Sequence, residues 1–169
     1  MRRRLAGSAA LLAAAALAGG GCTDTTIDGE PVPALDLAFY AASVQRYVGY
    51  GCGSLDCHGE AGRMLRIYAE DGLRQSAELR GEVIEASEIA ANVASFAAIE
   101  LDASSAADSL TLRKPLAVTA GGMAHEGGDV WLAVEEDGYR CLRGWLAGEL
   151  TVEVAAACHA ATTEVVPPP

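Results

Sequence analysis

Apolar residues recur at helical spacing in three stretches of the chain, which predicts a mostly α domain with long loops. The first stretch begins after Asp36, a suitable N-cap, and ends near Gly49 and Gly51. The second covers about 82–101 and the third about 137–148. The side chains that this spacing predicts to be buried are Leu37, Tyr40, Val44, Tyr47, Val48, Ile89, Val93, Phe96, Ile99, Tyr139, Leu142, Trp145 and Leu146.

The segments between these stretches lack a helical period. Residues 63–68, "RMLRIY", are apolar enough for a short extended segment. Residues 102–109 and the long glycine-rich stretch 110–131 are predicted to be irregular. We expect Trp131, at the end of that stretch, to anchor the core, as Trp145 does on the third helix.

The first 21 residues have the anatomy of a secretory signal peptide. Three arginines precede an uncharged apolar run from Leu5 to Ala18, which is short for a membrane span, and three glycines lead to Cys22. Cys22 resembles the lipidated first residue of a bacterial lipoprotein, and Thr23 favours the outer membrane. We therefore expect an exported protein, on the periplasmic or cell-surface side of the outer membrane and anchored by lipid at Cys22. A simply secreted protein is the alternative.

The expected organisation is a signal peptide at 1–21, a lipid-proximal linker at 22–34, one domain at 35–150 and a C-terminal tail at 151–169. Removal of the signal peptide, with its three arginines and no acidic residue, would take the formal net charge from −11 to −14. So acidic a chain is not expected to bind nucleic acid, which requires basic residues against phosphates.

Two cysteines and a histidine are crowded at the end of the first predicted helix, where Cys52, Cys57 and His58 have the spacing C-x4-C-H. C-x-x-C-H is the attachment signature of c-type haem, in which two thiols anchor the porphyrin and the histidine binds the iron. Here two further residues separate the cysteines. The same residues could form a local disulfide, or a metal clip with one further ligand.

Three blocks of the sequence resemble the cytochrome c-like domains of exported myxobacterial and planctomycete proteins. These blocks are "YVGYGCGSLDCHGEAGRMLRIY", "DSLTLRKPLAVTAGGMAHEGGDVW" and "DGYRCLRGWLAGEL". They match, in order, a C-H-G element after a first helix, an "SLxLxKP" segment with an "HxGG" loop, and a closing "D-x-Y-x-x-L-x-x-W" helix. The resemblance covers about residues 37–148, most of the chain after the signal peptide, and implies a small cytochrome c-like helical domain.

The resemblance implies haem c bound through thioethers to Cys52 and Cys57, with His58 as the proximal iron ligand. The distal ligand would come from the loop before the last helix, where His125 matches the family pattern and Met123 is the alternative. Such a protein is an electron carrier more often than an enzyme, and its redox partner is unknown.

Haem attachment would leave Cys141 and Cys158 as a disulfide pair in an oxidising compartment. The competing hypothesis is a lipoprotein of this fold without a cofactor. In that protein a Cys52–Cys57 disulfide would replace the thioethers, and the domain would be an interaction or structural module.

Overall fold

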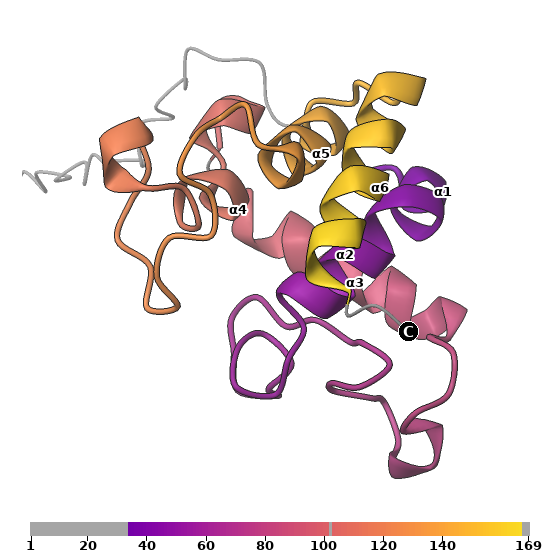
Figure 1. Ribbon diagram of the computed structural model, residues 1–169. Helices are drawn as coiled ribbons and strands as arrows, with labels where there is room; N and C mark the ends of the chain where they lie inside the picture. Colours follow the sequence, from indigo (N-terminus) through magenta and orange to yellow (C-terminus); the bar gives the residue numbers. More distant parts are fainter. Residues whose placement is uncertain (1–33, 102, 167–169) are drawn as a thin grey trace, which may run out of the picture.

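The computed structural model describes residues 34–101 and 103–166, where the chain forms helices joined by long loops (Figure 1). The prediction of a mostly α domain is therefore confirmed. The α-helices are α1 (Leu37–Phe39), α2 (Gln45–Gly51), α3 (Ala86–Ile99), α4 (Leu110–Arg113), α5 (Asp137–Leu146) and α6 (Val152–Val165). A π-helical turn covers Tyr40–Val44, and 3₁₀ turns cover Ala77–Leu79, Ala106–Asp108 and Val118–Ala120.

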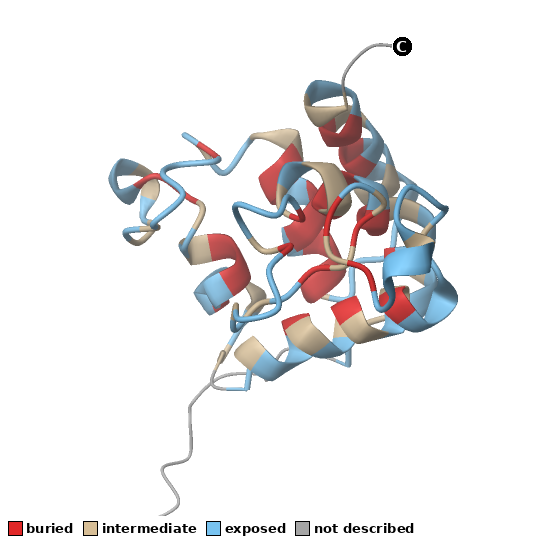
Figure 2. Cartoon of the chain, turned by 90° about the horizontal axis from the view of Figure 1, so that it is seen from below, coloured by how far each residue is buried: buried red, intermediate tan, exposed pale blue. Residues whose placement is uncertain are grey.

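The expected signal peptide at 1–21, Cys22 and the linker up to residue 33 lie outside the described residues. Within the two described ranges, no helix is both long enough and apolar enough to cross a membrane. The buried residues gather on the inward faces of the helices, where they form one core (Figure 2).

The first predicted helix begins where the sequence indicates. The Asp36 carboxylate accepts a hydrogen bond from the backbone N–H of Phe39 at 2.7 Å, and helical structure then continues to Gly51. Four of the five predicted positions are buried: Tyr40, Val44, Tyr47 and Val48. The prediction for Leu37 is wrong, because this side chain is 46 % exposed. The π turn inserts an extra residue, so the positions before it lie on a different face from those after it.

Helix α3 is held by a capping box in which the side chains of Glu85 and Glu88 bind each other's backbone N–H. Phe96 is buried as predicted, while Ile89, Val93 and Ile99 are only partly buried. Two polar residues, Glu88 and Asn92, are fully buried in their place. The Asn92 side chain donates to Gln45 Oε1 at 2.9 Å and accepts from the N–H of Tyr68 at 2.7 Å. This amide therefore joins α3 to α2 and to the loop between them.

Helix α5 buries all four residues that its period predicts, Tyr139, Leu142, Trp145 and Leu146. It is not the last helix, because residues 152–165 of the predicted C-terminal tail form α6. Thr151 caps α6 by accepting from the N–H of Val154, and α6 packs against α5 and α2 (Figure 1). Its buried face is made of small residues, such as Ala157 and Ala161, which a search for large apolar side chains overlooks.

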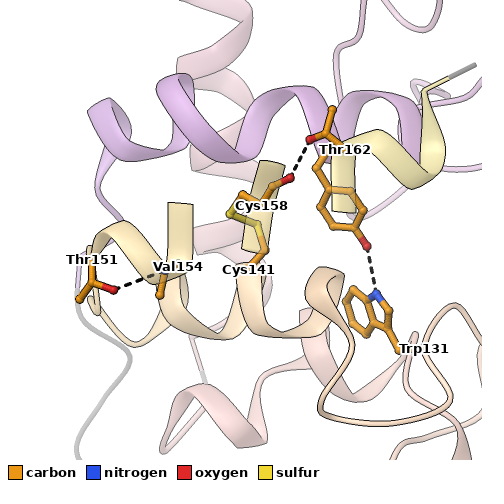
Figure 3. Close-up of a disulfide and its surroundings, with 7 residues drawn as sticks. Trp131, Cys141, Thr151, Val154, Cys158 and Thr162 are labelled. Carbon is orange, nitrogen blue, oxygen red and sulfur yellow. Dashed lines mark hydrogen bonds between the residues drawn. A yellow bond between two sulfur atoms is a disulfide. The ribbon is translucent and has the colours of Figure 1, made fainter. Parts of the chain in front are cut away.

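The expected disulfide between Cys141 and Cys158 is present and joins α5 to α6, with 17 residues of sequence separation (Figure 3). Replacement of both cysteines by serine is expected to lower the free energy of unfolding by about 3 kcal/mol, since the unfolded chain loses a cross-link. Urea unfolding of the variant and the oxidised wild type measures this difference. Equal midpoints and slopes for the two proteins would contradict the expected role of the bond.

Two predictions about the loops need correction. Residues 63–68 form no strand, and Tyr68 takes part only in an isolated bridge with Leu73. In 110–131, short helical turns interrupt the predicted irregular stretch. Trp131 is buried as expected, and its indole N–H donates to Tyr47 Oη at 3.0 Å (Figure 3). This bond fixes the end of the long loop on α2.

Candidate functional site

The C-x4-C-H segment folds as a compact loop directly after α2. The carbonyl of Ser54 accepts hydrogen bonds from the N–H of Cys57 at 3.0 Å and of Gly59 at 2.9 Å, and the N–H of His58 donates to Cys52 O at 3.0 Å. The residues between the two cysteines are thus taken up in a tight turn. A Cβ atom on Gly59 would lie 2.2 Å from Gly53 O, so the glycine after the histidine is required by close backbone packing.

Both cysteines of this loop are free thiols in the structure. Cys57 is exposed, and Cys52 is partly buried at the end of α2. The pKa of the Cys52 thiol is raised to about 12, mainly by burial and to a smaller extent by the neighbouring Cys57. In the described ranges, no three or more His, Cys, Asp or Glu side chains lie close enough to hold a metal ion together.

His58 is held in one tautomer by the backbone. Its Nδ1 lies 2.8 Å from the carbonyl oxygen of Leu65, which can only accept a hydrogen bond, so Nδ1 carries the proton and Nε2 has the free electron pair. Burial lowers the pKa of this imidazole, with further lowering by His125 and Arg63, while the bond to Leu65 opposes the shift. His58 is therefore a neutral, oriented imidazole at neutral pH.

His125 is also oriented by a backbone carbonyl next to its Nδ1. Its Nδ1 lies 3.0 Å from the carbonyl oxygen of Gly128, which again leaves Nε2 free to bind a ligand. Gly128 has a φ of 81°, a backbone conformation that favours glycine, and its N–H returns a bond to His125 O at 3.0 Å. The glycines after the histidine thus build the turn that holds the ring.

The structure brings these two histidines together, although they are 67 positions apart in the sequence. Their ring centres are 6.1 Å apart, and the ring planes differ by only 9°. Two imidazole nitrogens about 2 Å from one metal ion, on opposite sides of it, would put their ring centres about 6 Å apart. The two rings, each with Nδ1 against a backbone carbonyl, are therefore the candidates to hold a metal ion or a metal cofactor between the two loops.

One ion pair joins the two loops, and two further contacts hold the segment that carries His125. The Arg63 guanidinium lies 3.4 Å from a carboxylate oxygen of Glu126, next to His125, and donates to Cys57 O at 3.2 Å. On the other side, the Lys114 ammonium lies 3.5 Å from Ala124 O. Met123, the alternative ligand, is fixed through its backbone N–H, which donates to Arg113 O at 2.7 Å. The sequence reasoning missed Arg63, Glu126 and the two carbonyl acceptors, because side-chain motifs carry no signal for a backbone oxygen.

The loop that carries His58 also exposes apolar side chains. Met64 is 91 % exposed and Leu55 is 55 % exposed. Large apolar groups at such exposure mark surfaces that bind another apolar body when they lie together. Both side chains are therefore available to contact a bound group.

In protein without a cofactor, the His58 pKa is expected to lie below 6.5, mainly because of burial. Below about pH 6.5, His58 binds a proton more readily in the unfolded chain than in the folded protein. The free energy of unfolding should therefore fall as the pH drops below this value. Replacement of His125 by alanine should raise the His58 pKa only in part, because burial remains. Titration by NMR measures both values, with His159→Ala as the control. A His58 pKa at or above 6.5 in the wild type would contradict the described environment.

Comparison of the chain with protein-family models, with curated proteins and with solved structures finds no match.

Proposed function

We propose that this protein binds haem c and transfers electrons, with His58 and His125 as the residues that would hold the iron. The observation that carries the proposal is the pair of near-parallel imidazoles 6.1 Å apart, each with Nδ1 bound to a backbone carbonyl and Nε2 free. Backbone carbonyls that orient ligating histidines in this way are typical of metal sites. The C-H-G loop around His58 and the glycine-rich loop around His125 each hold one imidazole ring through a backbone carbonyl.

Cys52 and Cys57 would anchor the cofactor covalently, next to the ligand His58. A thiol adds across a vinyl group with the sulfur and the hydrogen both retained, so attachment needs no oxidant. Cys57 is exposed and can be reached by a maturation enzyme, whereas Cys52 is partly buried at the helix end. The apolar side chains of Leu55 and Met64 would then lose their contact with water.

Bound haem would supply one-electron chemistry at iron. His58 and His125 would both bind the iron, which favours an electron carrier over an enzyme. Two imidazoles also lower the reduction potential relative to a histidine–methionine pair. The proposed carrier would be a lipoprotein of the outer membrane, anchored at Cys22 after removal of the predicted signal peptide, and its redox partner is unknown.

The second candidate is the cofactor-free lipoprotein, in which the domain is an interaction or structural module. The free thiols of Cys52 and Cys57, close enough for one to raise the pKa of the other, favour it, because such thiols can form a local disulfide in an oxidising compartment. A disulfide and two thioethers exclude each other at these sulfurs.

The absorption spectrum of protein made in a host with haem c maturation enzymes separates the two candidates. The proposal predicts a Soret band that survives acid–acetone extraction, with the visible bands of six-coordinate low-spin iron in both redox states. Protein with no haem band, from cells in which a control cytochrome c is matured, would overturn the proposal.

A further inference from the structure

The segment that follows His125 presents apolar side chains to solvent from a fixed backbone. Val130 is 44 % exposed, Leu132 is 71 % exposed and Val134 is 40 % exposed. These three side chains, here called the 130–134 ridge, precede and follow the buried Trp131 in the sequence, in a segment drawn in orange in Figure 1. The ridge lies five to nine residues after His125.

Hydrogen bonds hold the ridge in place. Pro115 O accepts from the N–H of Val130 at 2.8 Å and of Trp131 at 3.1 Å, and the N–H of Ala117 donates to Trp131 O at 2.8 Å. The carboxylate of Glu136 accepts from the N–H of Leu132 at 2.6 Å and of Ala133 at 3.1 Å. A preformed surface of this kind loses little entropy when a partner binds to it.

Acidic residues flank the ridge in the sequence. Glu126, Asp129 and Glu135 are exposed, and no lysine or arginine occurs between Glu126 and Tyr139 in the sequence. The only ion pair described for these three is between Glu126 and Arg63. An apolar segment with acidic flanking residues is complementary to a partner that has an apolar patch bordered by basic residues.

We propose that the 130–134 ridge is the docking surface for a basic electron-transfer protein. The proposal rests on the proposed function, because the ridge adjoins the loop of an iron ligand and a partner bound there would lie close to the haem. Transient redox complexes are small, so three exposed apolar side chains with acidic flanking residues are a sufficient contact. The negative charge of the chain would steer the partner toward this surface.

The test is calorimetric titration of the protein with a mitochondrial-type cytochrome c, a strongly basic electron carrier, at two salt concentrations. Asp129→Asn/Glu135→Gln is expected to raise Kd about 5-fold at low salt and to reduce the salt dependence. Leu132→Ser/Val134→Ser is expected to raise Kd about 3-fold with the salt dependence unchanged.

The matched control is Asp71→Asn/Glu82→Gln, which removes the same two charges from exposed positions in the 70–85 loop, drawn far from the ridge in Figure 1. It should change Kd less than 2-fold. Equal weakening by the ridge and control charge variants, or no effect of the serine variant, would overturn the proposal. The proposal would also be overturned if the haem-free protein bound the partner and the haem-loaded protein did not, since the cofactor would then cover the ridge. Calorimetry needs no haem, so failure of haem binding and failure of docking give different results.

Discussion

In the haem protein proposed above, replacement of His125 by alanine is expected to leave the haem attached and to convert its iron from six-coordinate low-spin to largely five-coordinate high-spin. Attachment depends on Cys52 and Cys57, which the change does not touch, whereas the sixth ligand is lost with the imidazole. Nearly all of the low-spin signal in electron paramagnetic resonance should disappear. Exogenous imidazole should restore it, because the cavity left by the side chain can admit the free ring.

Two control variants sharpen this test. Met123→Leu removes the alternative ligand two residues away and should leave the low-spin spectrum unchanged. His159→Ala removes a histidine of α6 that has no place in the proposed site and should also have no effect. If Met123→Leu abolished the low-spin signal and His125→Ala did not, the ligand assignment would be wrong.

The second large effect is expected at a buried ion pair that the sequence did not indicate. Arg74 and Glu88 lie 2.8 Å apart with side chains 2 % and 0 % exposed. Replacement of Arg74 by methionine would leave the Glu88 carboxylate buried without its cation, at a cost of about 3–5 kcal/mol in the free energy of unfolding. The guanidinium also donates to the carbonyls of Glu82 at 2.7 Å and Val83 at 3.1 Å, so the loop before α3 should loosen as well.

Urea unfolding of Arg74→Met against Arg80→Met measures this cost. Arg80 is an exposed arginine of the same loop, and its replacement should change stability by less than about 0.5 kcal/mol. A double variant, Arg74→Met/Glu88→Leu, should recover much of the loss, because neither charge is then buried alone. Equal stability of the two single variants would show that the pair does not hold the loop.

The Arg74–Glu88 ion pair also makes the free energy of unfolding depend on pH in the acidic range. Burial alone would raise the pKa of Glu88, but hydrogen bonds from Arg74 and from the N–H groups of Gln75 and Glu85 outweigh it and hold the pKa below its usual value of 4.5. As the pH falls, Glu88 is therefore protonated in the unfolded chain before it is protonated in the folded protein. The contribution of Glu88 to stability is complete above about pH 4.5 and is lost as the pH falls below it. In Glu88→Gln this part of the pH dependence should be absent.

The sequence predicts helices well where large apolar side chains recur, as in α5, whose four expected core residues are all buried. The sequence pattern fails where the buried face of a helix consists of small or polar residues. Helix α6 buries alanine and cysteine, and α3 buries Glu88 and Asn92, which a hydrophobic pattern counts as surface. A buried acid next to an arginine that is 14 residues away cannot be read from periodicity, because the pairing depends on how a loop folds back.

The candidate site was predictable in part. The C-H-G motif and the glycine-flanked His125 stand out as chemistry-bearing segments, and the resemblance named both histidines as ligands. Their separation, their protonation state and the carbonyls of Leu65 and Gly128 that fix them are products of backbone geometry and appear only in the structure.

The most direct test of the central claim is the mass of the tryptic peptide Tyr47–Arg63, which contains Cys52, Cys57 and His58 and follows the cleavage site at Arg46. The peptide is prepared without reductant from protein made with the haem c maturation enzymes. Haem attachment through two thioethers predicts the mass of the peptide plus one whole haem, because both thiol hydrogens are retained. A peptide lighter by two hydrogens, the mark of a Cys52–Cys57 disulfide, or one with two free thiols, would contradict the account.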